Sequence, residues 1–222
     1  MARALDVAGD RWTLLIVREL LPGPRRFTDL VEGLPGISRK LLTDRLRDLE
    51  RDGIIARREL PPPAARQVYE LTDDGRDLAS AMAPLIGWGV GRMGELEPED
   101  TFRPRWAAVG MASLANREAA AGVRETFQFL VGDSAFHFVV DDGTIELHDG
   151  RAEDPGVVWT ADEETFAEIA SGRLAASSAI ASGALTIAGD KKATKRLGEI
   201  FGRRQIFTHA REVATGGQAS ER

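Results

Sequence analysis

The chain has 222 residues, 43% of them hydrophobic and 29% charged, which is typical of a folded globular protein of one or two domains. It contains no cysteine, and this excludes disulfides, thiolate nucleophiles and cysteine-ligated zinc or iron–sulfur sites. The formal net charge is −6, yet residues 1–94 hold 15 basic and 14 acidic side chains, whereas residues 95–222 hold 14 and 21. Residues 36–66 hold 8 basic and 5 acidic side chains, so a local cationic patch for nucleic acid is compatible with an acidic chain.

Patterns typical of enzymes, metal sites and membrane proteins are weak in this sequence. His137 alternates with two phenylalanines and is expected to point away from their face, and His148 lies next to Asp149 with Glu146 nearby. No leader sequence is visible, and the longest uncharged runs are too short to cross a bilayer. We therefore expect a cytoplasmic protein with no membrane insertion, no enzymatic activity, no cofactor and no resident metal.

Composition divides the chain into two parts. Phe27 is the only phenylalanine before residue 102, and eight follow. Between the two parts, residues 94–101 are acidic, contain Pro98 and show no apolar periodicity, as a linker would. We predict a first domain at 1–94, a linker at 95–103 and a second domain at 104–222.

Helix caps and turn residues set the limits of the elements in the first domain. Asp10, Ser38 and Thr72 are placed as N-caps, and Gly53 as a C-terminal glycine. The expected elements are helices over residues 11–21, 27–34, 39–51 and 73–92, with strands over 54–60 and 67–71 joined by a proline-rich tip at 61–65.

This order of elements is that of a winged helix-turn-helix. Five segments, in sequence order, resemble the HxlR-type transcriptional regulators over about residues 2–93: ALDVAGDRWTLLI (4–16), GPRRF (23–27), LPGIS (34–38), LLTDRLRDLE (41–50) and YELTDDG (69–75). Many members of that family sense oxidants or electrophiles through a reactive cysteine near the N-terminus. The absence of cysteine excludes that input here.

The helix over residues 39–51 is the expected reading helix. At 100° per residue, Leu42, Leu46 and Leu49 fall on one face and predict its buried side. Cationic and hydrogen-bonding groups lie opposite this face or at the entry, where they suit guanine edges, thymine methyls and phosphates. These candidate DNA contacts are Ser38, Arg39, Lys40, Thr43 and Arg47. A solvated helix face is the alternative, and Asp44 on the same side either opposes DNA or orients Arg47 or Lys40.

Further arginines lie outside the reading helix. Arg57, Arg58 and Arg66 are expected to contact phosphates or the minor groove from the wing, and the alternative is that their charge protects an edge strand. Arg26, before the second helix, is a candidate phosphate contact, with simple solvation as the alternative.

One reading helix covers too few base pairs for useful specificity, so we expect a homodimer on paired half-sites. The helix over residues 73–92 and the residues just after it have more apolar side chains than one small domain needs. We predict that this region pairs with its mate and with residues 2–7. Its apolar residues are Leu78, Met82, Leu85, Ile86, Trp88 and Met93.

The second half predicts an α+β layout, with helices on one face of a five-stranded antiparallel-type sheet. Pro104 opens the first helix, and Asp162 and Asp190 are placed as N-caps. The expected strands are 126–131, 135–140, 144–148, 157–160 and 184–188, and the expected helices are 105–115, 163–171, 173–181 and 191–201.

Residues 157–174 and 181–190 resemble the sterol carrier protein-type lipid-binding domain, most closely at SGRL (171–174) and SGALTIAGD (182–190). The resemblance implies a non-catalytic shell around an apolar cavity for fatty acyl or sterol-like ligands. A filled core is the alternative. The candidate cavity residues are Phe127, Phe129, Phe136, Phe138, Trp159, Phe166, Leu174, Ile180 and Phe201.

Together these features predict a DNA-binding transcriptional regulator, with repression favoured because it is the commoner outcome for such architectures. Its expected partners are double-stranded DNA, a second copy of the chain and a hydrophobic small-molecule effector. The alternative is a lipid-carrying or interaction protein in which the winged helix contacts other proteins.

Overall fold

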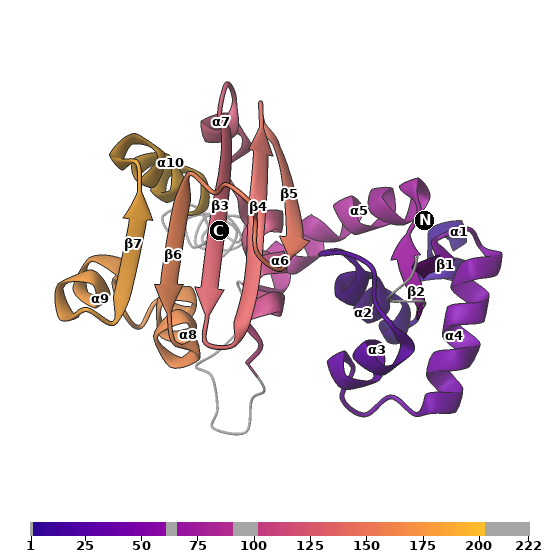
Figure 1. Cartoon of the computed structure of the whole chain (residues 1–222). Coiled ribbons are helices and arrows are strands. Elements are labelled where there is room, and N and C mark those ends of the chain that lie inside the picture. Colours follow the sequence, from indigo (N-terminus) through magenta and orange to yellow (C-terminus); the bar gives the residue numbers. More distant parts are fainter. Residues whose placement is uncertain (1, 61–65, 91–101, 203–222) are drawn as a thin grey trace, which may run out of the picture. The chain divides into compact units, whose positions relative to one another are not determined.

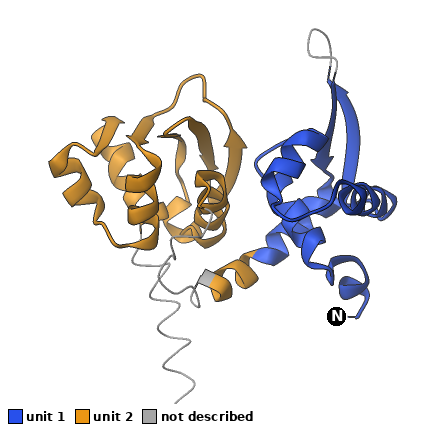
Figure 2. Cartoon of the chain, turned by 90° about the horizontal axis from the view of Figure 1, so that it is seen from below, with its two compact units in different colours: residues 1–82 blue, residues 83–222 orange. Residues whose placement is uncertain are grey.

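The computed structural model describes residues 2–60, 66–90 and 102–202, which form the elements labelled in Figure 1. By internal contacts the chain divides into two compact units, residues 1–82 and 83–222, coloured separately in Figure 2. The division falls within one helix. Residues 95–101 of the predicted linker and the predicted wing tip at 61–65 lie outside the described residues.

The first unit is a helix-turn-helix followed by a two-stranded wing, as predicted. Its short first helix was not predicted. That helix contains no buried residue, and its sequence has no apolar stripe that would have indicated it. The elements are α1 (Ala2–Ala8), α2 (Arg11–Leu20), α3 (Phe27–Gly33), α4 (Arg39–Arg51), β1 (Ile55–Leu60), β2 (Arg66–Leu71) and α5 (Asp73–Val90), the last of which continues into the second unit.

The predicted caps are present and explain where these helices begin. The Asp10 carboxylate accepts hydrogen bonds from the backbone N–H groups of Trp12 (2.6 Å) and Thr13 (3.3 Å) at the start of α2. The Ser38 hydroxyl accepts the backbone N–H of Leu41 at 3.2 Å and starts α4. After α4, Gly53 has a φ of +75°, a conformation that favours glycine and turns the chain into β1.

The wing is an antiparallel pair fastened to the helices. Ile55 lies opposite Leu71 in the β1–β2 register. Tyr69 also exchanges two backbone hydrogen bonds with Arg25, at 2.8 and 2.7 Å, in the segment before α3. Arg25 thus forms an isolated antiparallel bridge to β2, and this bridge connects the wing to the segment before α3.

The second unit is a sheet with helices packed on one face. Its further elements are α6 (Pro104–Leu114), α7 (Arg117–Ala120), β3 (Arg124–Val131), β4 (Ser134–Asp141), β5 (Thr144–Asp149), β6 (Val157–Ala161), α8 (Glu163–Ser171), α9 (Ala176–Ser182), β7 (Leu185–Gly189) and α10 (Lys191–Phe201). The five strands and the helices at 104–114, 163–171 and 191–201 were predicted. The short α7 was not, and α9 begins three residues later than predicted.

The strand order is β5-β4-β3-β6-β7. Three of its neighbouring pairs are antiparallel, but β3 and β6 are parallel, with Phe127 opposite Val157. The segment 150–156 therefore crosses β4 and β3 before β6 begins. Local pattern does not reveal such a crossing, because the same apolar run fits a strand of either direction.

A cluster of aromatic rings fills the space between this sheet and its helices. Phe129 lies at its centre: its ring centroid is 5.2 Å from that of Phe136, 5.6 Å from that of Trp159 and 6.5 Å from that of Phe166 on α8. Phe201 closes the cluster from α10. Alternation along β3 and β4 places these rings on one face and Gln128 and His137 on the other.

Gln128 fastens the crossing segment to the second face of the sheet. This amide is buried, and its Nε2 donates to the carbonyls of Phe136 (2.8 Å), Phe129 (3.0 Å) and Gly150 (3.3 Å). Its Oε1 accepts the backbone N–H of Ala152 at 2.7 Å. Gln128 therefore pairs one carbonyl and one N–H of the crossing segment, and His137 Nδ1 also lies 3.2 Å from the Gly150 carbonyl.

We predict that Gln128→Leu lowers the free energy of unfolding by about 1–3 kcal/mol, because it keeps the volume but takes away the acceptor of the Ala152 N–H and a donor to the three carbonyls. Urea denaturation followed by circular dichroism measures this. Thr160→Leu, at an exposed position on the same face, is the control and should change stability by less than about 0.5 kcal/mol. Equal stability of Gln128→Leu and the wild type would contradict the role given to the amide.

Candidate functional site

The outer face of α4 is the candidate nucleic-acid interface. Leu42, Leu46 and Leu49 are buried in the core of the first unit, which confirms the predicted inner face. Its outward-facing residues at the N-terminal end and middle are all exposed: Arg39, Lys40, Thr43, Asp44 and Arg47.

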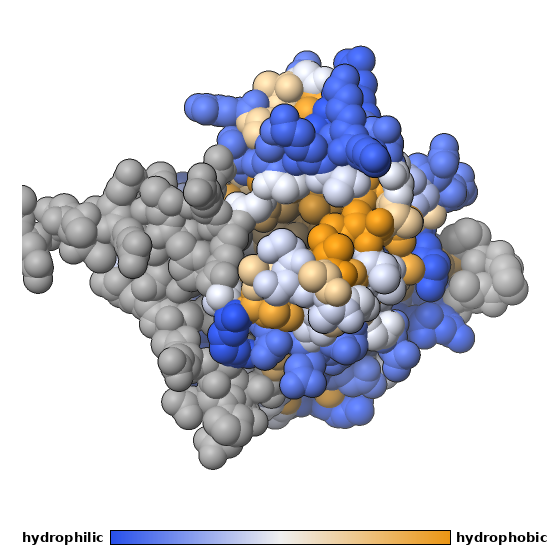
Figure 3. Space-filling model, turned by 90° about the vertical axis from the view of Figure 1, so that its left-hand side faces the viewer, coloured by the Kyte–Doolittle hydropathy of each residue, from blue (hydrophilic) through white to orange (hydrophobic). Residues whose placement is uncertain are grey.

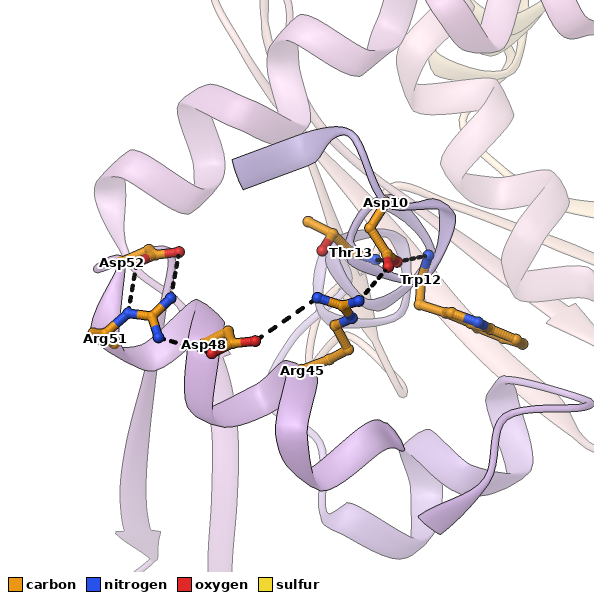
Figure 4. Close-up of polar contacts among 7 residues, drawn as sticks. All are labelled: Asp10, Trp12, Thr13, Arg45, Asp48, Arg51 and Asp52. Carbon is orange, nitrogen blue, oxygen red and sulfur yellow. Dashed lines mark hydrogen bonds and ion pairs between the residues drawn. The ribbon is translucent and has the colours of Figure 1, made fainter. Parts of the chain in front are cut away.

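The cations of α4 fall into two groups. Arg45 pairs with Asp10 at 2.7 Å, and Arg51 pairs with Asp48 at 2.9 Å and with Asp52 at 3.1 Å, so acidic neighbours compensate both. Hydrogen bonding and charge from Asp52, followed by the charge of Asp48, raise the pKa of Arg51 above its usual value. Figure 4 shows these contacts as one chain of alternating charges.

The second group carries uncompensated charge. Within the described part of the chain, Arg39, Lys40 and Arg47 form no ion pair with any acidic side chain. Asp44 likewise pairs with neither Lys40 nor Arg47 there, so nothing supports its predicted orienting role. Free positive charge is therefore concentrated at the N-terminal end and middle of the helix, the region that a reading helix offers to base edges.

Thr43 has a restricted set of contacts to offer. Its hydroxyl donates to the Arg39 carbonyl at 2.9 Å within α4, so its hydrogen is already used. The oxygen lone pairs and the methyl group remain outward. This group fits the exocyclic amino group of a base or a thymine methyl better than a base acceptor.

The wing arginines differ from one another. Arg57 lies 3.4 Å from the Glu50 carboxylate of α4 and over the Tyr69 ring, and Arg58 lies 3.1 Å from Glu70. These pairs favour the alternative in which Arg57 and Arg58 protect an edge strand by their charge, over contact with DNA. Arg66 is exposed at the start of β2 and has no ion pair among the described residues.

The two arginines before α3 differ in exposure. Arg26 is exposed and is the N-cap residue of that helix, where its backbone N–H donates to Asp29 at 3.0 Å. Its guanidinium forms no ion pair within the described chain. Arg25 is half-buried at the bridge to the wing. The Arg26 side chain is thus exposed at the start of α3.

The apolar stripe of α5 begins in the core of the first unit and continues onto exposed surface. Leu78 and Met82 pack against the core of the first unit, whereas Leu85 and Trp88 further along are 51% and 56% exposed. Leu5 on α1 is 56% exposed. Met93, also in the predicted set, lies outside the described residues.

The predicted cavity residues do not all lie together. Seven are buried in the aromatic cluster, and Leu174 is half-buried: the seven are Phe127, Phe129, Phe136, Phe138, Trp159, Phe166 and Phe201. Ile180, by contrast, is 48% exposed and is not buried among the rings. On α9 the inward residue is Ala179, which is fully buried, and the next residue of a helix points about 100° away.

An apolar hollow lies on the side of the second unit that carries β7, α9 and α10. The space-filling view shows hydrophobic surface gathered there between hydrophilic surfaces (Figure 3). Apolar side chains of this region that keep exposed area include Ile180 and the half-buried Leu174 and Ile187. The rings pack against one another, so this surface is a better candidate for an apolar ligand than the cluster.

A second depression is polar and was not predicted. An open groove of about 500 Å³ lies between β3, β4 and the segment before β6. Arg124 at its rim pairs with Asp141 at 2.8 Å, and hydrogen bonding to Asp141, with that residue's charge, raises the pKa of Arg124. Its charged lining does not suit a hydrophobic ligand. It comprises Arg124, Glu125, Thr126, Val139, Val140, Asp141, Asp154 and Gly156.

The histidines provide no metal cluster in the part of the chain described. The rings of His137 and His148 stack at 5.2 Å, and His148 Nε2 is 3.2 Å from Glu146 Oε2. No group of three or more His, Asp or Glu side chains is placed there to hold a metal ion. None of the helices within residues 2–60, 66–90 and 102–202 has the length and apolar character needed to cross a membrane.

Comparison with known proteins gives a separate match for each half of the chain. Residues 7–97 match the HxlR-like helix-turn-helix family, and residues 108–202 match the SCP-2 sterol transfer family. Similar proteins include the HTH-type transcriptional regulators YvaP and YodB of Bacillus subtilis. They are 37% and 36% identical over 88 residues, which is 40% of this chain and 82% and 79% of theirs. The regulator Rv3095 of Mycobacterium tuberculosis is 45% identical over 89 residues, 40% of this chain and 56% of its own.

Among solved structures, the reduced form of YodB from B. subtilis matches with a TM-score of 0.39 and 33% identity. The match covers 44% of this chain and 95% of that one. The chain belongs to the HxlR-like family of helix-turn-helix transcriptional regulators, and it carries an SCP-2 sterol transfer family domain after its winged helix.

Proposed function

We propose that this protein binds a specific DNA sequence as a homodimer and represses transcription, and that its C-terminal domain binds a hydrophobic molecule that alters DNA binding. The observation that carries the proposal is the exposed face of α4, where Arg39, Lys40 and Arg47 have no acidic partner among the described residues. Repression is proposed because a dimer seated on promoter DNA excludes other proteins from it without further contacts.

Unpaired cations on one helix face are what a reading helix needs. Arginine binds guanine O6 and N7 in a bidentate manner, and lysine and arginine release counterions when they neutralise phosphates. Thr43 on the same face offers an acceptor and a methyl group. Arg26 and Arg66 are proposed phosphate contacts that set the orientation of the domain on the duplex.

We predict that the triple substitution Arg39→Ala, Lys40→Ala and Arg47→Ala lowers affinity for the preferred duplex by about 100-fold or more, since base and phosphate contacts are lost together. The duplex is obtained by selecting bound sequences from a random pool with the wild type, and affinity is measured by fluorescence anisotropy. Arg51→Ala is the matched control, because that exposed cation of the same helix is already held by Asp48 and Asp52.

The control should retain affinity within about threefold, as expected for an exposed ion pair. A wild-type protein that shows no preference over random duplex at moderate salt would overturn the proposed function. The alternative, a lipid-carrying or interaction protein whose winged helix contacts other proteins, would then be favoured.

Dimer formation is proposed through α5 and α1. Leu85 lies about 20° from Leu78 around the helix at 100° per residue, so the stripe that packs on the core continues into exposed surface. Leu5 adds exposed apolar area on α1. A second copy that covers these residues would present two reading helices to adjacent half-sites.

We predict that Leu85→Asp shifts the protein from dimer to monomer at micromolar concentration, because a carboxylate would be buried without a partner in the interface. Sedimentation equilibrium measures the mass. Ser80→Asp adds the same charge to an exposed position about 140° around the same helix and should leave the dimer intact. A wild type that is monomeric while bound to its duplex would contradict this arrangement.

The proposed effector site is the apolar hollow on the side of the second unit that carries β7, α9 and α10, elements that include Ile187 and Ile180. Its support is the exposed hydrophobic surface there together with the match to the SCP-2 sterol transfer family. A ligand acts as a switch only if it binds the DNA-competent and incompetent states unequally, and a tenfold change in DNA affinity needs about 1.4 kcal/mol of difference.

We predict that wild type binds a fluorescent fatty acid, cis-parinaric acid, and that Ile180→Asp weakens this binding by about tenfold, because the bound ligand would cover a carboxylate in place of an apolar side chain. Fluorescence titration measures the affinity. Thr144→Asp, on the opposite edge strand, should bind like the wild type. No binding of this probe, of palmitate or of a sterol by wild type would favour a C-terminal domain without an effector.

A further inference from the structure

One carboxylate of the first unit serves two elements at once. Asp10 Oδ1 accepts the backbone N–H groups of Trp12 and Thr13 and so caps α2. Its other oxygen, Oδ2, lies 2.7 Å from the guanidinium of Arg45 in the middle of α4 (Figure 4). Asp10 therefore ties the start of one helix to the candidate reading helix, across 35 positions of sequence.

The Asp10–Arg45 pair connects two parts of the first unit. Asp10 lies two residues after the end of α1, the helix with the exposed Leu5. Arg45 lies between Lys40 and Arg47 along α4 but points to the side, where Asp48 follows at 3.7 Å. The pair therefore connects the junction of α1 and α2 directly to the helix whose outer face is proposed to read DNA.

The Asp10–Arg45 pair is partly shielded from solvent. The side chains of Arg45 and Asp10 are 34% and 27% exposed, and Arg45 Nε is shielded from solvent. A charge-assisted hydrogen bond in such surroundings is short and directional. The leucines under α4 hold it by burial of apolar area, which has little directional preference. The ion pair is thus suited to fix how far α4 can rotate or slide.

We propose that Asp10 and Arg45 are positioning residues that set the orientation of α4 for DNA recognition, without contacting DNA. This inference rests on the proposed function. Recognition needs side chains held to within about 0.5 Å, so a small rotation of α4 misplaces Arg39, Lys40 and Arg47 together. The role predicts an effect on specific binding that exceeds any effect on stability, because partly exposed ion pairs contribute little to folding.

Asp10→Asn gives a test in which two explanations have opposite signs. Asparagine caps a helix about as well as aspartate, so α2 keeps its start. The substitution removes one negative charge from the domain, and by field strength alone it should tighten binding to DNA. If Asp10 is a positioning residue, its replacement should instead weaken binding of the selected duplex by about tenfold. A change of this size is typical of coupling between two parts of a protein.

Arg45→Met and Lys40→Met form a matched pair, since each removes one cation from α4. Lys40 is proposed to contact DNA, so its loss should reduce the slope of log affinity against log salt by about 0.9. Arg45→Met should weaken binding of the selected duplex by about tenfold with that slope unchanged. Anisotropy titrations at several salt concentrations, with the selected duplex and a random duplex, provide both readouts.

The double variant Asp10→Asn with Arg45→Met should bind no more weakly than either single variant, because one interaction is lost in all three. Thermal unfolding and circular dichroism of each variant confirm that the helices remain. Asp10→Asn that binds as tightly as wild type or tighter, or Arg45→Met that lowers the salt slope as Lys40→Met does, overturns the inference. A wild type that selects no duplex is a distinct result, and it overturns the proposed function together with this inference.

Discussion

Burial of three leucines on one side of α4 is the constraint on which the first unit depends. Leu42, Leu46 and Leu49 anchor the helix to its core, and helical geometry then determines which side chains face outward. The cations of the outer face cannot turn inward without exposing these leucines. The same burial that stabilises the domain therefore presents Arg39 and Lys40 to solvent, and the proposed reading surface requires no separate scaffold.

Acidic residues then decide where along α4 the positive charge remains. Asp48 and Asp52 neutralise the C-terminal turn, and Asp10 neutralises its middle from another helix. Residues 95–222 carry seven more acidic than basic side chains, so the positive charge on α4 contrasts with the net charge of the second half. On α4 itself, uncompensated positive charge is thus confined to the N-terminal end and middle of the helix, so the direction in which these side chains point depends on the orientation of the helix.

In the second unit, burial of one face likewise determines which side chains face outward, but along strands, where side chains alternate every two residues, and not along a helix with 3.6 residues per turn. Alternation puts the phenylalanines of β3 and β4 on one face, where α8 and α10 cover them. The rings pack closely against one another in the centre of the unit, and exposed apolar surface lies instead on the side that carries β7, α9 and α10. On the other face the amide of Gln128 binds Gly150 and Ala152 of the crossing segment, after which β6 runs parallel to β3.

What was predictable from sequence is what neighbouring residues decide. The Asp10 and Ser38 caps, the Gly53 turn and the inner face of α4 depend on spacings of a few residues, and all are present. The parallel pairing of β3 and β6 depends on a chain crossing, and the exposure of Ile180 depends on where α9 begins; neither leaves a local signal. The same holds for the Asp10–Arg45 pair. Each residue has an ordinary local role, as a helix cap and as one charge on a helix, and only the tertiary fold brings them to 2.7 Å. A function that depends on such a pair is invisible to motif reading, because the motif records which residues face the DNA and not what holds them there.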